Sequence, residues 1–485
     1  MDVLLGIDIG TGSTKGVLTD LSGTVLATRT IEHAMELPRP GWAEFDAETV
    51  WWGEVCETSR ALVAQMPANA TVAGVCVSGI GPCLLVCDDT LTPLRPAILY
   101  GIDTRASDEI DVLTAELGDD EIIARGGSRL SSQAIGPKLL WLRRHEPEVF
   151  TRATKWFSSN SYIAAKLTGG YVIDHHTASQ CDPLYATKDF DWNHDWAQQI
   201  CGHLRLPRLV WPDEAVGVVT SAAATASGIP AGTPVIAGTV DAYAEAFSVG
   251  VRKPGDLMLM YGSTMFFVQI LAEYHTDPVL WATAAVERHT HALAAGTATA
   301  GSLLSWLQNL TGNASFEEIT AEALAVPPGS DGVLMLPYLA GERTPVYDPL
   351  ARGVITGLNL RHGRGHLFRA AYEGIAFGVR EVLERFDAAA PAARIVAVGG
   401  GVQSPIWAQA VSDICDRTQL VPRQTIGASY GDALLAGIGA GVLPADTDWT
   451  EAVGTIEPDP ERSALYDDLY QTWRELYPAT KRIGC

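Results

Sequence analysis

A short segment near the N-terminus combines the residue types that phosphate binding requires. It reads Gly6-Ile7-Asp8-Ile9-Gly10-Thr11-Gly12-Ser13-Thr14-Lys15. Gly10 and Gly12 let the backbone approach an anion closely, while the hydroxyl and ammonium groups add donors and a positive charge. Asp8, at the end of the preceding strand, is suited to hold Mg²⁺ through water, because that ion prefers carboxylate oxygen and keeps much of its hydration. The segment lacks the Gly-Lys-Ser/Thr step that opens a helix in a P-loop, and an ordinary glycine-rich hairpin explains it equally well.

A second candidate is Asp241, which follows the strand predicted at 235–240 and precedes a run of mostly small residues. A carboxylate at this point can reach a ligand, while the N-terminus of the following helix supports its charge and can receive phosphate. Aspartate is also a common N-cap residue, and the spacing alone favours that structural interpretation.

Two further groups of residues suit ligand binding. Gly399–Gly401 comes after a strand and before a helix that Ser404 would cap, so a flat base or a ribose could lie against bare backbone there. Asp103 and Arg105 follow the apolar strand 96–100. They could bind sugar hydroxyls, or they could form a surface ion pair of little energetic value.

The elements that must position these residues alternate between strands and helices, which predicts an α/β fold with mainly parallel or mixed sheets. Leu4–Asp8 and Thr14–Leu18 read as a hairpin, and Asp46 is a good N-cap for the helix that follows it. The segment 256–265 repeats the strand, small-residue turn and strand of the N-terminus. This repetition predicts two similar halves that face each other across a cleft, with a boundary near 249–254.

Length and charge narrow the class of protein. At 485 residues the chain is too long for one ordinary hydrophobic core, so two large domains are expected. Its 34 Lys and Arg against 57 Asp and Glu give a formal net charge of −23, which argues against nucleic acid and an anionic membrane as partners. The N-terminus has no signal-peptide pattern, and no apolar run approaches bilayer length. The eight scattered cysteines are expected to be reduced thiols, so we expect a cytoplasmic protein.

Several motifs in the second half of the chain are more specific than any of these features. Gly353-Val354-Ile355-Thr356-Gly357-Leu358 is followed after seven residues by His366-Leu367-Phe368-Arg369-Ala370-Ala371-Tyr372-Glu373. Supporting segments are 138–142, 337–343 and 399–405. Taken in order, these motifs resemble the FGGY carbohydrate kinases over nearly the whole chain, and within that family the xylulose kinases most.

The resemblance implies a fold and a set of roles. The fold would be two actin-like (ribonuclease H-like) ATPase domains, at 1–250 and 251–485, with ATP and a sugar in the cleft between them. Asp241 falls on the family's catalytic aspartate and Asp8 on the acidic residue near the metal and the phosphates. The first phosphate loop would comprise Thr11, Gly12, Ser13, Thr14 and Lys15, the second Gly262, Ser263 and Thr264, and the nucleotide pocket Gly301, Gly400, Gly401 and Ser404. A homodimer is a further expectation from the family.

The departures from the family pattern concern the sugar. Xylulose kinases typically carry Gln-Met-His-Gly where this chain has Gly79-Ile80-Gly81-Pro82, so Ile80 and Gly81 would face the substrate with no polar side chain. Ala242 stands where xylulose kinases usually have Asn. The expected activity is ATP- and Mg²⁺-dependent phosphorylation of a primary hydroxyl of a small sugar, with D-xylulose as the first candidate. The alternatives are a kinase for glycerol, ribulose, erythritol or gluconate, and a non-catalytic sensor of ATP or sugar.

Overall fold

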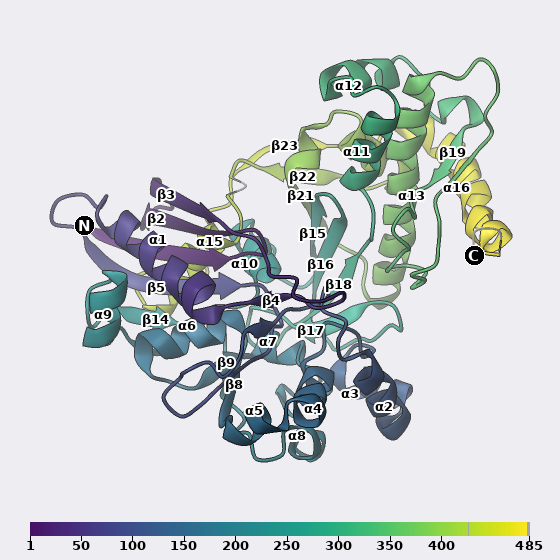
Figure 1. Ribbon diagram of the computed structural model, residues 1–485. Helices are drawn as coiled ribbons and strands as arrows, with labels where there is room; N and C mark the ends of the chain where they lie inside the picture. The colour runs from purple at the N-terminus through teal and green to yellow at the C-terminus, as the bar shows by residue number, and fades with distance from the viewer. Residues whose placement is uncertain (425, 483–485) are drawn as a thin grey trace.

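The computed structural model describes residues 1–424 and 426–482. The chain forms two mixed β-sheets, each flanked by helices (Figure 1). The first sheet has the order β13-β14-β5-β1-β2-β3. Its strands, in chain order, are β1 Asp2–Ile9, β2 Ser13–Asp20, β3 Val25–Glu32, β5 Thr71–Gly79, β13 Ala215–Val218 and β14 Pro234–Ile236.

The second sheet has the order β17-β18-β16-β15-β21-β22-β23. Its strands are β15 Asp256–Tyr261, β16 Met265–Leu271, β17 Trp281–Ala284, β18 His291–Gly296, β21 Arg394–Val398, β22 Gln419–Pro422 and β23 Ala452–Ile456. Antiparallel β15 and β16 stand beside parallel β21, just as antiparallel β1 and β2 stand beside parallel β5. The predicted hairpin, its copy and the two-domain α/β architecture are therefore confirmed.

The described first half of the chain contains ten helices. They are α1 Glu54–Val63, α2 Ser107–Leu117, α3 Asp119–Gly126, α4 Ile135–His145, α5 Pro147–Arg152, α6 Ser159–Thr168, α7 His175–Ser179, α8 His194–Cys201, α9 Ser221–Ser227 and α10 Asp241–Ser248. Helices α1, α6 and α10 pack on the first sheet, and α2, α3, α4, α5 and α8 build the lower part of the molecule in Figure 1. A π-helical turn at Ala47–Gly53 precedes α1, and the Asp46 carboxylate accepts from the amides of Glu48 and Thr49 at 2.9 Å, as its N-cap role predicts. Short strands lie in this half at Glu44–Phe45 (β4), Leu85–Cys87 (β6), Ala97–Ile98 (β7), Lys155–Phe157 (β8), Val172–Asp174 (β9), Tyr185–Ala186 (β10), Asp191–Trp192 (β11) and Arg208–Val210 (β12).

The helices of the second half are α11 Gly301–Leu310, α12 Phe316–Leu324, α13 Arg364–Ala389, α14 Trp407–Cys415, α15 Ala428–Gly439 and α16 Pro460–Thr480, with the small strands β19 Leu334–Leu336 and β20 Val354–Thr356. The 26-residue α13 carries many of the apolar side chains of this half's core. The family-like motif 366–373 thus lies on the helix that organises the second domain.

One helix does not stay with its own half of the chain. α15, yellow-green in Figure 1, packs on β1 and β5 of the first sheet and beside α10. A Cβ on Gly6 would collide with the Ser429 carbonyl oxygen, so glycine is required where the helix meets the strand. Ser78 Oγ of β5 also donates to the Asp432 carboxylate of α15 at 2.6 Å. The predicted division at residue 250 therefore separates the two sheets, and α15 links them.

Two expectations concern the whole chain. In the described ranges, no helix is long and apolar enough to cross a membrane. The seven cysteines within those ranges form no disulfide, and Cys485 lies outside them.

Candidate active site

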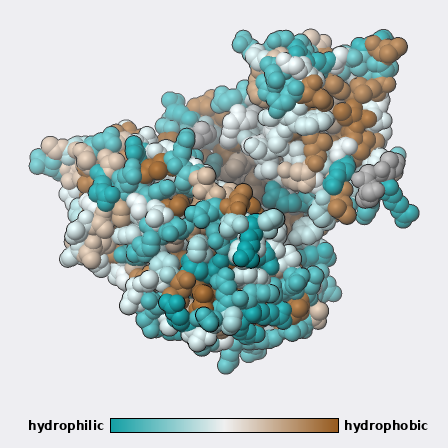
Figure 2. All heavy atoms as spheres, viewed as in Figure 1, coloured by the Kyte–Doolittle hydropathy of each residue, from teal (hydrophilic) through white to brown (hydrophobic). Residues whose placement is uncertain are grey.

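A cavity of about 460 Å³ lies between the two halves of the molecule. In the space-filling view the surface is hollowed between them (Figure 2). We call this space the interdomain cavity. Its walls come from the β1–β2 turn, the start of α10, the β15–β16 turn and β17. Of the residues predicted from the sequence, it is lined by Asp8, Thr11, Gly12, Ser13, Lys15, Gly81, Asp241 and Thr264.

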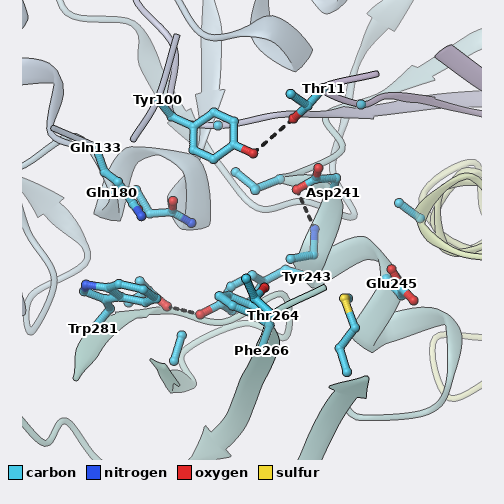
Figure 3. Close-up of a pocket in the computed structure, with 18 of the residues that line it drawn as sticks. Thr11, Tyr100, Gln133, Gln180, Asp241, Tyr243, Glu245, Thr264, Phe266 and Trp281 are labelled. Carbon is cyan, nitrogen blue, oxygen red and sulfur yellow. Dashed lines mark hydrogen bonds between the residues drawn. The ribbon is translucent and has the colours of Figure 1, made fainter. Parts of the chain in front are cut away.

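Asp241 is the first residue of α10, one position after the N-cap residue Val240. Its Oδ1 accepts from the amide of Ala242 at 2.7 Å, and its carboxyl group faces the interdomain cavity (Figure 3). Burial raises the pKa of Asp241 to about 6. The carboxylate is therefore deprotonated near neutral pH, with a pKa suited to accepting a proton from a bound hydroxyl.

Asp8 and Glu245 add two carboxyl groups to the same cavity, and Lys15 adds an ammonium group. Burial and the nearby charge of Asp241 raise the pKa of Asp8 to about 8 and that of Glu245 to about 7. Lys15 lowers both pKa values, but one ammonium group cannot offset burial and the mutual repulsion of three ionised carboxyl groups, which is why two of them hold their protons to higher pH. The site therefore suits a bound cation.

The donor set indicates which cation fits. The groups are carboxylate oxygens, which Mg²⁺ prefers. No cluster of three or more His, Cys, Asp or Glu side chains in the described ranges could hold a metal on its own. A divalent ion here would thus take one or two carboxylates, with Asp8 the first candidate, and complete its coordination with water and phosphate oxygens.

The phosphate turn at the start of the chain is held in shape by its own backbone. The amide of Gly10 donates to the Ser13 carbonyl at 2.9 Å, and the amide of His33 donates to the Gly12 carbonyl at 3.1 Å. Thr11 Oγ1 lies 3.1 Å from the Tyr100 hydroxyl, which is drawn in Figure 3. Backbone hydrogen bonds therefore hold the turn, and its small residues line the cavity.

Four predicted site residues line neither this cavity nor the second one described below. The Thr14 side chain is fully buried in β2, and its hydroxyl has no hydrogen-bond partner among the described residues. Ile80 is also fully buried, and its carbonyl accepts from Ser159 Oγ at 2.7 Å. Strand alternation turns the Thr14 side chain into the core while the neighbouring Lys15 faces the cavity. Ile80 lies in the bend that follows β5, and there the neighbouring Gly81 faces the cavity.

The other two are Asp103 and Arg105, whose side chains are completely buried as an ion pair at 2.6 Å. Asp103 also accepts from the amide of Ala43 at 2.7 Å, and Arg105 pairs with Glu44 at 2.8 Å. The guanidinium lies 3.8 Å from the ring centroid of Trp42. The pair is therefore not a surface ion pair, and neither residue lines the wall of the interdomain cavity, so their role in binding a sugar stays a prediction.

The sequence analysis missed much of the polar wall that a sugar would contact. Gln133, Gln180, Asp182 and Trp281 all line the interdomain cavity. They come from the loop before α4, the end of α7 and β17. No motif marks them, and the polar run at 128–133 is the one local signal that precedes this wall.

A second cavity, of about 700 Å³, lies within the second half of the chain. We call it the C-terminal cavity. It brings together six predicted residues, Gly262, Ser263, Gly301, Gly400, Gly401 and Ser404, and adds apolar and aromatic side chains that the sequence analysis missed, including Leu304, Phe316, Tyr372 and Trp407. Glycine backbone faced by aromatic and aliphatic side chains suits a flat base and a ribose.

The β15–β16 turn connects the two cavities. Gly262 and Ser263 line the C-terminal cavity, whereas the next residue, Thr264, lines the interdomain cavity. The start of α11 fixes this turn, since the Gly301 amide donates to the Gly262 carbonyl at 3.0 Å. A Cβ on Gly301 would lie only 2.6 Å from that carbonyl oxygen, so glycine is needed for the close approach.

The glycine-rich segment after β21 differs in detail from its prediction. Gly400–Gln403 forms a 3₁₀ turn, and α14 begins only at Trp407. Ser404 Oγ accepts from the Trp407 amide at 3.4 Å, a weak version of the predicted cap. Gly400 has open space where a side chain would stand. Its bare backbone therefore faces the C-terminal cavity.

Comparison with known proteins agrees with this geometry. The model of the FGGY family of carbohydrate kinases, N-terminal domain, matches residues 3–248, and the corresponding C-terminal domain model matches residues 257–440. The chain belongs to the FGGY carbohydrate kinases. It is 31% identical to a xylulose kinase of Escherichia coli over 98% of each chain. A gluconokinase of Bacillus subtilis is 28% identical, covering 98% of this chain and 94% of that protein. The crystal structure of a xylulose kinase from Rhodospirillum rubrum superposes with a TM-score of 0.92 at 31% identity over 99% of both chains.

Proposed function

We propose that this sugar kinase transfers the γ-phosphoryl group of ATP to a primary hydroxyl of a small ketose, with D-xylulose as the first candidate and D-xylulose 5-phosphate as its product. The relatives named xylulose kinase support the choice of sugar. The observation that carries the reaction is the β15–β16 turn, which lines the nucleotide-like C-terminal cavity on one side and the cavity of Asp241 on the other.

The proposed arrangement follows from the two cavities. The adenine and ribose occupy the C-terminal cavity, and the phosphates pass the turn at Gly262–Thr264 toward the first phosphate turn. Asp241 accepts the proton of the sugar hydroxyl as its oxygen attacks the γ-phosphorus. Lys15 and the backbone of Gly10–Ser13 offset the charge on the transferred group. A Mg²⁺ ion near Asp8 would add charge neutralisation at the phosphates.

A kinase for gluconate is the second candidate, because the gluconokinase relative matches nearly the whole chain at similar identity. Kinases for glycerol, ribulose or erythritol stay open for the reason given by the sequence, namely the unusual Gly79–Pro82 segment and Ala242. A non-catalytic sensor is the least economical alternative, because a sensor needs no buried base such as Asp241.

The test is sugar-dependent ADP release by the purified full chain with ATP and Mg²⁺. D-Xylulose, D- and L-ribulose, glycerol, erythritol and D-gluconate are ranked by kcat/KM. The proposal predicts the highest kcat/KM for D-xylulose. A higher value for another acceptor would replace xylulose and keep the kinase, whereas ADP release that no acceptor stimulates would contradict sugar phosphorylation altogether.

A further inference from the structure

The orientation of one amide in the interdomain cavity follows from a buried histidine. His176 lies in α7, and its Nδ1 is 2.7 Å from the Ala284 carbonyl oxygen. A carbonyl can only accept, so Nδ1 carries the proton. Burial lowers the pKa of His176 to about 3, which keeps the ring neutral and leaves Nε2 as an acceptor.

Gln180 completes this chain of hydrogen bonds. Its Nε2 lies 2.6 Å from His176 Nε2, and only the amide nitrogen can donate to that acceptor. The amide oxygen of Gln180 is therefore the atom left to face the cavity that Gln180 lines. Figure 3 shows Gln180 beside Gln133, across the cavity from Asp241. The wall opposite the base thus presents a fixed hydrogen-bond acceptor.

Asp182 stands two residues further on and lines the same cavity, although its residue is only 5% exposed. Its Oδ1 lies against Gly126, where a Cβ would collide with it, and has no hydrogen-bond partner within residues 1–424 and 426–482. Its other oxygen, Oδ2, forms no hydrogen bond or ion pair within those ranges, so that oxygen is available to a ligand in the cavity. Burial raises the pKa of Asp182 well above its usual range, and no nearby cation offsets that effect.

Three cationic side chains line the interdomain cavity, namely Lys15, Arg129 and Arg343. Lys15 acts on the carboxyl groups of Asp8, Asp241 and Glu245 and lowers their pKa values. Arg129 pairs with the Asp119 carboxylate at 3.1 Å. Arg343 donates to the Thr297 carbonyl at 2.6 Å and lies next to the buried Glu342. None of these three cations offsets the raised pKa of Asp182, which has burial as its cause, so no cation in the described ranges is placed to neutralise an anionic group beside that residue.

We propose that Gln180 and Asp182 select a neutral polyhydroxy sugar and reject aldonates. A hydroxyl group on the substrate can donate to the Gln180 oxygen and pair with the Asp182 carboxyl, so both polar groups of this wall gain a partner when the sugar binds. A carboxylate in the same place would face the Gln180 oxygen, which can only accept, and a second carboxyl group that no cation among the described residues stabilises. His176 acts as a positioning residue, because it fixes which end of the amide faces the substrate.

This inference rests on the proposed function, and its test compares a neutral sugar with an aldonate in one assay. The wild-type chain should show kcat/KM for the best neutral ketose or polyol about 100-fold above that for D-gluconate. Gln180→Leu, which keeps the bulk but removes the acceptor, should lower kcat/KM for the neutral sugar about tenfold, mainly through KM, with the KM for ATP unchanged. Asp182→Asn, which replaces a carboxyl group that can ionise with an amide that cannot, should narrow the ratio of kcat/KM for the neutral sugar to that for D-gluconate about tenfold.

Gln65→Leu is the matched control, because Gln65 is exposed at the end of α1 and lies outside both cavities. Equal or better use of D-gluconate by the wild-type chain would overturn the inference while leaving a sugar kinase in place. An unchanged ratio in a folded Asp182→Asn variant, judged by its thermal melting curve, would also overturn it. If no acceptor of either class stimulates ADP release, the proposed function itself fails, and that outcome is distinct from the other two.

Discussion

The two cavities differ in chemistry although a single turn borders both. The interdomain cavity gathers Asp8, Asp241 and Glu245 around Lys15 and holds their pKa values above the ordinary range by burial and mutual repulsion. The C-terminal cavity is walled by glycine backbone and by aromatic and aliphatic side chains, with Glu317 as the acidic residue of its lining. Carboxyl groups with perturbed pKa values are typical of sites for catalysis or cation binding, whereas open backbone beside aromatic rings is typical of sites that bind a ligand.

The two halves of the molecule share one arrangement of strands but differ in the residues placed around it. Both halves contain the same hairpin beside a parallel strand. Only the first pairs its turn with an aspartate at the start of a helix, and only the second places glycine-rich segments around an open cavity. Substitutions in the first cavity should therefore change turnover, and substitutions in the second should change nucleotide affinity.

Gly400→Val should have a large effect on nucleotide binding. The new side chain would meet no protein atom within 4 Å at its Cβ, so the fold should tolerate it, but it would occupy space in the C-terminal cavity. We expect the dissociation constant for ATP, measured by calorimetry, to rise about 10–100-fold. kcat at saturating ATP should change far less. Gly454→Val is the control, because Gly454 is exposed in β23 and also has open space for a side chain. If Gly400→Val lowered kcat more than it lowered the affinity for ATP, the proposed difference between the two cavities would be wrong.

Asp8→Asn should make the protein more stable while harming its function. Because burial and Asp241 raise the pKa of Asp8 from 3.8 to about 8, the wild-type folded state keeps a proton that the unfolded chain releases. The stability that this proton provides is present below pH 4 and is lost as pH rises toward 8. In urea unfolding without nucleotide or divalent cation, the variant should therefore exceed the wild type by ~1–3 kcal/mol at pH 8.5 and by little at pH 4.5. A gain that is equal at both pH values would refute this electrostatic cause.

The smallest effect separates two neighbouring threonines of the first phosphate segment. Thr11 lines the interdomain cavity, whereas the Thr14 hydroxyl is buried in β2 without a partner. Thr11→Val should raise the KM for ATP about threefold to tenfold through one lost hydrogen bond. Thr14→Val should leave that KM within about twofold and preserve stability, because it removes an unpaired hydroxyl. A larger rise in the KM for ATP in Thr14→Val than in Thr11→Val would contradict the assignment of Thr11 as the threonine that faces the nucleotide.

Much of the framework could be predicted because it depends on local signals. The hairpin, its copy and the glycine segments are encoded by alternation and by turn residues that lie close together in the sequence. Thr14 and Ile80 lie in predicted segments but line neither cavity, because a motif identifies a stretch of chain and the local backbone decides which of its side chains faces the cavity. The burial of Asp103 and Arg105 could not be predicted because their partners, Ala43, Glu44 and Trp42, are some sixty residues distant.

The part of the interdomain cavity wall that no motif marks could not have been predicted from the sequence, for a different reason. Gln133, Gln180 and Trp281 come from three separate elements that only the tertiary fold brings to one cavity. The role of Gln180 depends further on the proton of His176, which is fixed by a carbonyl in the other half of the chain. Such a relation has no local pattern in the sequence.

The central claim is that Asp241 acts as the base of a phosphoryl transfer whose nucleotide is held elsewhere. The most direct measurement is kcat for sugar-dependent ADP release by Asp241→Asn, together with its dissociation constant for ATP, beside the exposed control Asp195→Asn. The account predicts a loss in kcat of about 10²–10⁴-fold with ATP binding nearly unchanged. Turnover close to that of the control, or a loss confined to ATP affinity, would contradict it.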